Sequence, residues 1–140
     1  NLAKLSGPAV QESIQKTNRA IREATGQSAT LVRPPYGSLG GKARPTLAAM
    51  GYSATLWDID TLDWKTKNED NTVNVVLSQV KDGDIVLMHS IYAQSAAAAE
   101  RIIPELTRRG YQLVTVSELA AARGVKMEPG HSYGSFHKKK

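Results

Sequence analysis

The chain has 140 residues, of which 41% are apolar and 22% charged, a composition typical of a globular domain that can bury its own core. It contains no cysteine, which excludes disulfides, thiol nucleophiles and cysteine-ligated zinc, and no apolar run is long enough for a transmembrane helix. The net charge of +5 is concentrated in residues 125–140, where four lysines accompany one glutamate, whereas residues 1–124 are nearly balanced.

The elements predicted from apolar periodicity alternate between helix and strand along the chain. They are a helix at 6–26, a strand at 30–33, a helix at 41–51, a strand at 52–59, a helix at 71–83, a strand at 84–90, a helix at 95–110, a strand at 111–116 and a helix at 117–124. Ser6 and Ser117 are the expected N-caps of the first and last helices, and Pro104 is expected to kink or divide the fourth. The alternation predicts an α/β fold with parallel strands.

The end of the chain, residues 125–140, is predicted to be a basic tail that follows a single domain at 1–124. We expect this tail to be solvated and disordered, and a role in binding nucleic acid or an anionic cell surface is the alternative. No signal peptide is recognisable, and the start at Asn1 instead of methionine predicts a piece of a longer protein.

A histidine, His89, follows the predicted strand at 84–90 and is the one histidine outside the tail. In a parallel α/β fold ligands bind beyond the carboxyl ends of the strands, so a histidine there can act as a general acid or base. A satisfied structural histidine is the alternative. The chemical interpretation requires a carboxylate that orients the imidazole ring.

Three carboxylates, those of Asp58, Asp60 and Asp63, follow the strand predicted at 52–59. One of them can pair with His89, favour its protonated form and fix its tautomer. A solvated acidic loop is the alternative. Metal binding by these carboxylates alone is weakly indicated, because no second histidine is nearby in the sequence.

The segment RPPYG at 33–37 follows the first predicted strand and forms a stiff turn. Its two prolines fix backbone torsions, and Gly37 permits an unusual one. Such a turn can direct backbone N–H groups at a developing oxyanion, and Arg33 can orient a carboxylate. A rigid surface turn with an exposed arginine is the alternative.

Taken together, RPPYG at 33–37, DTLDW at 60–64 and IVLMH at 85–89 resemble, in the same order, three motifs of the polysaccharide deacetylases. This is the NodB-homology family, carbohydrate esterase family 4. The segment RRGYQLVTVSEL at 108–119 is similar to the closing strand and helix of that family. The resemblance covers residues 1 to about 124 and implies the C-terminal part of a distorted (β/α) barrel with parallel strands.

The resemblance implies roles for individual residues. Arg33 would orient the catalytic base, and the backbone N–H of Tyr36 would form part of the oxyanion hole. Asp63 would tune His89, which would donate a proton to the leaving amine.

Further residues of the same motifs would contact the substrate. Trp64, Leu87 and Tyr36 would line the groove around the acetyl group, whereas Asp60 is expected to be structural.

Two earlier motifs of the family have no counterpart in this sequence. One is an Asp pair that supplies the base and a metal ligand, and the other is a His-x-x-x-His segment that supplies two more ligands. The opening NLAKLS resembles the family's segment directly downstream of the second motif. We therefore expect no metal ligand in this chain, a divalent metal such as Zn²⁺ held by an upstream segment of the same protein, and an inactive chain in the absence of that partner.

The function implied is metal-dependent N-deacetylation of a polysaccharide outside a bacterial cell or at its surface. N-acetylglucosamine of peptidoglycan is the expected substrate, because DTLDWKTKN resembles the cell-wall branch of the family; chitin and acetylxylan are alternatives. A non-catalytic cell-wall carbohydrate-binding module, with Trp64 and Tyr36 stacking on sugar, is the alternative of another class. Specific nucleic-acid binding is not expected, because residues 1–124 carry little net charge.

Overall fold

The computed structural model describes residues 1–138, which gather into two compact units. Unit 1 comprises residues 1–56 and 126–133, and unit 2 comprises residues 57–125 together with 134–138. Each unit is built from parallel strands with helices, so the α/β class predicted from the sequence is confirmed. No helix within residues 1–138 is both long and apolar enough to cross a membrane.

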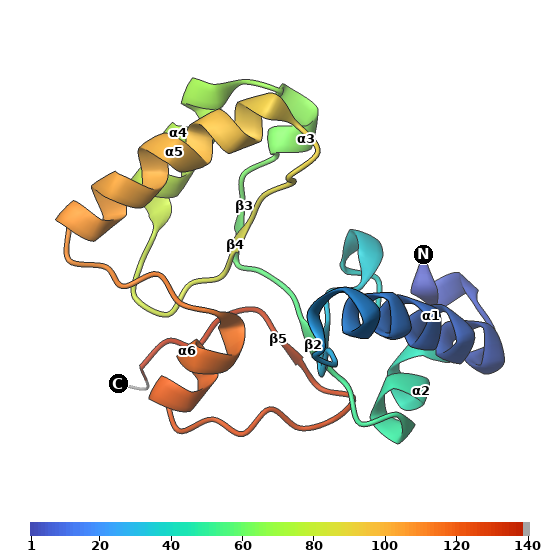
Figure 1. Ribbon diagram of the computed structural model, residues 1–140. Coiled ribbons are helices and arrows are strands. Elements are labelled where there is room, and N and C mark those ends of the chain that lie inside the picture. Colours follow the sequence, from blue (N-terminus) through green and yellow to red (C-terminus); the bar gives the residue numbers. More distant parts are fainter. Residues whose placement is uncertain (139–140) are drawn as a thin grey trace. The chain divides into compact units, whose positions relative to one another are not determined.

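Unit 1 is a three-stranded sheet with helices (Figure 1). The sheet has the order β1-β2-β5, all parallel, with Leu31 opposite Ser53 and Ala54 opposite Ser132. Its elements are η1 (Leu2–Lys4), α1 (Gly7–Thr25), β1 (Leu31–Val32), η2 (Pro35–Gly37), α2 (Ala43–Ala49), β2 (Ser53–Thr55) and β5 (Ser132–Tyr133). The sequence predicted α1 closely, because Ser6 caps it and Gly26 closes it in the left-handed conformation.

The core of unit 1 is formed where α1 and α2 pack on the sheet. Val10 and Ile14 of α1 and Leu47 of α2 are buried, as is Ala54 of β2. Residues four apart on a helix lie on one face, so Val10 and Ile14 pack together against this core.

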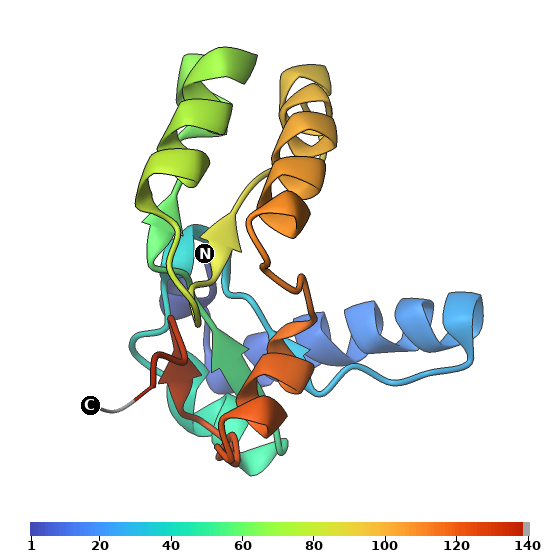
Figure 2. The ribbon, with the colours of Figure 1, turned by 90° about the vertical axis from the view of Figure 1, so that its left-hand side faces the viewer.

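Unit 2 is a two-stranded parallel pair with helices. Ile59 lies opposite Val86, and Asp60 lies opposite Leu87. Its elements are β3 (Ile59–Asp60), α3 (Asp63–Thr66), α4 (Glu69–Gln79), β4 (Val86–Leu87), α5 (Ala93–Arg108) and α6 (Val116–Ala122). Figures 1 and 2 show α4 and α5 side by side, and their shared core is Val73, Val76, Ala98, Ile102 and Leu106.

Three details of the helices and strands differ from the prediction. The expected strand at 52–59 is divided into β2 and β3. Pro104 does not divide α5, which is continuous, because proline removes a single backbone donor and here lies on the exposed face. Thr115, not Ser117, caps α6 and forms a reciprocal capping box with Glu118.

The strand predicted at 111–116 does not form within the described structure. Residues 112–115 are exposed and pair with no strand, and α6 already begins at Val116. An extended apolar run is stabilised as a strand only by a neighbouring ladder, and no strand of unit 2 supplies one here.

The expectation of a disordered tail at 125–140 is wrong for residues 125–138. Within unit 1, Ser132 and Tyr133 form β5 beside β2, and the hydroxyl of Ser53 donates to the carbonyls of Met127 (3.1 Å) and Glu128 (3.0 Å). Within unit 2, Phe136 is buried. Lys139 and Lys140 lie outside the described residues.

Candidate active site

The carboxyl ends of β3 and β4 bring Asp63 and His89 into contact. The two strands run parallel and in register, and the buried hydroxyl of Thr61 donates to the carbonyl of Leu87 at 2.8 Å. Leu62 then takes a left-handed conformation (φ 51°), after which α3 begins at Asp63. The turn reverses the chain beside the end of β4, where His89 follows two residues after Leu87.

The carboxylate of Asp63 is 1% exposed and accepts four hydrogen bonds. Its Oδ1 accepts the Nδ1–H of His89 at 2.7 Å and the backbone N–H of Trp64 at 2.9 Å. Its Oδ2 accepts the backbone N–H of His89 at 2.7 Å and the hydroxyl of Ser95 at 2.5 Å. A carboxylate has about four lone-pair positions, so all of them are filled.

These hydrogen bonds keep Asp63 ionised. Burial tends to raise the pKa of Asp63, but the hydrogen bonds from Ser95, His89 and Trp64 together outweigh it, and its pKa lies below the ordinary value. An ionised carboxylate only accepts, so the proton between the two side chains is on Nδ1 of His89. The Nε2 atom has no hydrogen-bond partner within residues 1–138, and the side chain is 31% exposed.

The turn at 33–37 lies in unit 1 as η2 and its flanking residues. Tyr36 has a positive φ of 62° although it is not glycine, a conformation that non-glycine residues rarely adopt. The N–H groups of Gly37 and Ser38 donate to the carbonyls of Pro34 and Pro35, whereas that of Tyr36 donates to no acceptor within residues 1–138. The turn therefore presents one unpaired backbone donor.

The remaining predicted residues are differently placed. Arg33 is exposed and has no ion pair within the described chain. Trp64 is 48% exposed and Tyr36 85% exposed, so a large part of each residue is accessible to solvent. Leu87 is buried at 5% exposure, so in this structure its side chain offers little surface for contact. The carboxylate of Asp60 accepts the N–H of Leu62 and stabilises the turn.

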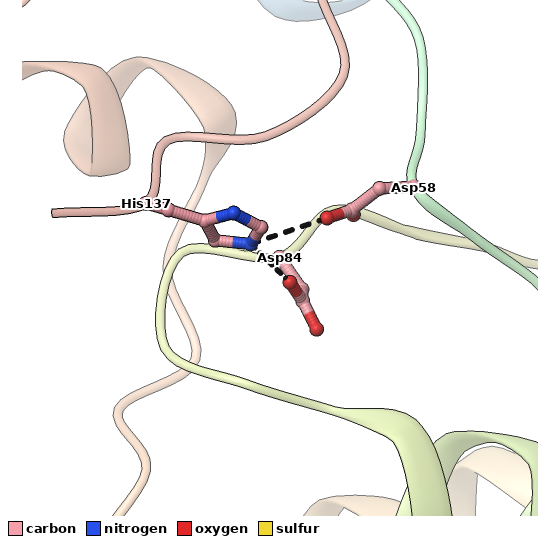
Figure 3. A group of neighbouring side chains, drawn as sticks. All are labelled: Asp58, Asp84 and His137. Atoms are coloured by element: carbon pink, nitrogen blue, oxygen red, sulfur yellow. Dashed lines mark hydrogen bonds and ion pairs between the residues drawn. The ribbon is translucent and has the colours of Figure 1, made fainter. Parts of the chain in front are cut away.

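A second group of carboxylates and imidazole lies at the amino ends of the same two strands (Figure 3). Nε2 of His137 lies 2.5 Å from Oδ1 of Asp84 and 3.3 Å from Oδ2 of Asp58. Among residues 1–138 this is the one group of at least three histidine or acidic side chains whose ligand atoms converge, within 4.8 Å of one another. Within residues 1–138 this group does not include Asp63 or His89.

Sequence reasoning missed Ser95 and His137. Ser95 lies six residues after His89 in a run of alanines, and no motif distinguishes it from a surface serine. His137 falls within the segment predicted to be a tail. The one feature of the sequence that relates to His137 is the glycine at position 83. Gly83 has a positive φ of 103°, and a Cβ there would lie 2.5 Å from the carbonyl oxygen of Phe136, so only a glycine allows residue 136 to approach this closely.

The model of the polysaccharide deacetylase family matches residues 1–55. The chain is 43% identical over 118 residues to peptidoglycan-N-acetylmuramic acid deacetylase PdaC of Bacillus subtilis, a match that covers 84% of this chain and 25% of PdaC. The solved structure of PdaC superposes with a TM-score of 0.82 at 41% identity, covering 88% of this chain and 59% of that one. The chain belongs to the polysaccharide deacetylase family.

Two other members of the family extend this comparison. Peptidoglycan-N-acetylglucosamine deacetylase PgdA of Listeria monocytogenes is 36% identical over 132 residues, which cover 94% of this chain and 27% of PgdA. A family 4 acetyl xylan esterase from Clostridium thermocellum, solved in complex with a cobalt ion, has a TM-score of 0.84 at 26% identity, covering 95% of this chain and 66% of that one. The chain spans about a quarter of the length of each of the two curated relatives. It forms part of the (β/α) barrel of the family.

Proposed function

We propose that this chain supplies the general acid and part of the oxyanion hole of a hydrolase that removes N-acetyl groups from peptidoglycan sugars. One observation supports it most strongly: a buried, ionised Asp63 receives Nδ1–H of His89 at 2.7 Å and leaves Nε2 available. The activities for which PdaC and PgdA are named agree with this reaction class.

In the proposed reaction His89 acts as the tetrahedral intermediate collapses. The imidazolium gives its Nε2 proton to the sugar nitrogen while the bond between that nitrogen and the acetyl carbon breaks. Acetate and a free amino sugar are the products. Asp63 holds the ring through Nδ1 and favours the protonated form of His89 by its negative charge, as a carboxylate does in other imidazole–carboxylate pairs.

The turn at 33–37 is proposed to serve the earlier half of the reaction. The unpaired N–H of Tyr36 is available to donate to the oxygen that becomes negative when water attacks the acetyl carbon. Arg33 is proposed to orient the catalytic base. The rare conformation of Tyr36 agrees with the tendency of strained residues to occur at functional sites.

A divalent metal, proposed to be Zn²⁺, would polarise the acetyl carbonyl and activate the attacking water when bound. Residues 1–138 offer no such group of ligands beside His89, since their convergent donors are Asp58, Asp84 and His137. We propose that the ligands, an Asp and two His, and the base lie on an upstream segment of the same protein. The acetyl xylan esterase from Clostridium thermocellum was solved with a cobalt ion, which supports the proposal of a divalent metal.

The proposed substrate is the N-acetylated glycan of peptidoglycan at a bacterial surface. N-acetylglucosamine is the unit proposed from the sequence, whereas the relative with the higher identity is named for N-acetylmuramic acid. Trp64, which is half-exposed and adjacent to Asp63 in the chain, is proposed to stack on a sugar ring near His89.

The test is acetate release from peptidoglycan fragments with added Zn²⁺. This chain is assayed alone and with the upstream segment, in the wild-type form and as His89→Ala. We expect turnover in the mixture and its loss in His89→Ala with Zn²⁺ binding retained. Full turnover by His89→Ala would contradict the acid role.

A non-catalytic wall-binding module is the second candidate, favoured by the exposure of Trp64 and Tyr36. Glycan binding that depends on Trp64, without acetate release in either preparation, would support this candidate and overturn the first.

A further inference from the structure

Ser95 is a buried hydroxyl that donates to a buried charge. It lies in the first turn of α5, is 3% exposed, and its Oγ is 2.5 Å from Oδ2 of Asp63. Its own backbone N–H donates to the carbonyl of Tyr92 at 3.0 Å, so the serine is fixed at the start of the helix. The interaction links α5 to α3, which are 32 residues apart in the chain at this point.

The geometry shows what this hydroxyl controls. Oδ2 of Asp63 accepts from Ser95 and from the backbone N–H of His89, while Oδ1 accepts from the backbone N–H of Trp64, so Ser95 is the one side-chain hydroxyl among the donors that hold the carboxylate. Oδ1 is then directed at Nδ1 of His89. Without the hydroxyl, Oδ2 would keep a single donor, the N–H of His89, and the carboxylate would be held less firmly in the plane that directs Oδ1 at the imidazole.

We propose that Ser95 is a positioning residue, which holds the Asp63 carboxylate in the orientation that directs His89. The proposal rests on the proposed function in that His89 is taken as the acid. It assigns to Ser95 a role in turnover without contact with the substrate. Hydrogen bonds to a charged acceptor are about twice as strong as neutral ones, so a single hydroxyl can have this influence.

A merely structural hydroxyl is the competing explanation, and unit 2 contains a matched example. Thr72 of α4 is 1% exposed, and its hydroxyl donates to the carbonyl of Asn68, the N-cap of the same helix. Thr72 therefore has the burial of Ser95 without the link to Asp63, and Thr72→Val is the control for loss of a buried hydroxyl.

The experiment follows the carboxyl ¹³C signal of Asp63 through a pH titration in this chain. Ser95→Ala should raise the pKa of Asp63 by about one pH unit, because a hydrogen bond to the charged form is lost. Ser95→Thr retains the hydroxyl and should restore the wild-type value, and Thr72→Val should leave it unchanged. If Ser95→Ala does not fold, Ser95→Cys, a weaker donor of similar size, replaces it.

The second readout is acetate release with the upstream segment present. We expect Ser95→Ala to lower kcat about tenfold with little change in KM, and Thr72→Val to change neither. An unmoved pKa of Asp63 in Ser95→Ala, or a moved pKa with wild-type kcat, overturns the proposal. Full turnover by His89→Ala would instead overturn the proposed function, while the ¹³C titration would still report the contact between Ser95 and Asp63.

Discussion

The two ends of the β3–β4 pair carry the same types of residue in different arrangements. At the carboxyl ends one carboxylate, Asp63, holds one imidazole, His89. At the amino ends two carboxylates, Asp58 and Asp84, share the imidazole of His137 (Figure 3). The same pair of strands therefore allows a direct comparison of what burial and hydrogen bonding do to an imidazole–carboxylate group.

The two groups differ in how their negative charge is satisfied. The single charge of Asp63 receives four donors, and its pKa is lowered. Partial burial raises the pKa of Asp58 and the neighbouring Asp84 raises it further, against the hydrogen bond from the N–H of Ile85. Burial tends to raise the pKa of Asp84 as well, but the hydrogen bonds from His137 and from the N–H of Lys81 lower it below the ordinary value, so the two carboxylates of this group shift in opposite directions.

The comparison separates an oriented acid from an attachment point. His89 is held by Nδ1 with Nε2 unpaired, whereas His137 uses Nε2 for both carboxylates. The second group, with the N–H of Phe136 donating to the carbonyl of Gly83 at 2.7 Å, connects residues 134–138 to residues 57–125 within unit 2. We therefore expect substitutions at the carboxyl ends to affect chemistry and those at the amino ends to affect stability slightly.

The largest expected effect is that of His89→Ala on turnover. Removal of a general acid should lower kcat by roughly 10²- to 10⁴-fold, measured as acetate release with the upstream segment present. His137→Ala is the matched control and should retain kcat. Equal losses in the two variants would contradict the separation of roles.

The next effect is that of Asp63→Ala on the free energy of unfolding. The hydroxyl of Ser95 and the backbone N–H of His89 would lose their acceptor inside the protein, which should cost about 3 kcal/mol in urea denaturation. Asp70→Ala is the control, because the side chain of Asp70 is 76% exposed and its partner Arg101 is 49% exposed. A loss below about 1 kcal/mol in Asp63→Ala would mean that the pair is not buried as described.

The free energy of unfolding should decrease at acidic pH, and part of this decrease, which we call the acid limb, should depend on Asp63. Its pKa in the folded chain lies below the ordinary 3.8, so its contribution is present above that value and is lost as the pH falls through the lowered pKa. Asp63→Asn should flatten this limb. Asp58, with a raised pKa, contributes with the opposite sign, so Asp58→Asn should make the limb steeper. Urea denaturation between about pH 2 and pH 6 measures both slopes, and identical changes would contradict the assignment.

The smallest expected effect is that of His137→Ala on stability. The imidazole is 48% exposed, and its partner Asp84, although 5% exposed, keeps the backbone N–H of Lys81 as a donor, so the loss should be about 1 kcal/mol, and less at high salt. Urea denaturation at low and high NaCl checks this. A loss as large as that of Asp63→Ala would show that the amino-terminal group is more than an attachment point.

The sequence was sufficient to predict the contacts that depend on neighbours in the chain. The caps of α1 are local, and the alternation of helices and strands places Asp63 and His89 at the ends of adjacent parallel strands. Element order could therefore anticipate that one of Asp58, Asp60 and Asp63 pairs with His89, and the family resemblance singled out Asp63. In the structure the pairing is a 2.7 Å hydrogen bond between Oδ1 of Asp63 and Nδ1 of His89.

The sequence failed where structure depends on distant partners. YQLVTV at 111–116 has the composition of a strand but lacks a neighbouring ladder, while Ser132 and Tyr133 lack the composition but pair with β2. Ser95 is recognisable only once α5 places it against Asp63. A two-residue strand or a single hydroxyl carries no periodic pattern from which it could be predicted.

The tautomer of the two histidines tests the central claim most directly, and ¹⁵N NMR of the imidazole rings in this chain measures it. Above the pH at which each ring loses its charge, we predict His89 with the proton on Nδ1, and His137 with the proton on Nε2. The proton of His89 should move from Nδ1 when Asp63 is replaced by Ala. A neutral His89 with its proton on Nε2 in the wild-type chain would contradict the claim that Asp63 directs this residue.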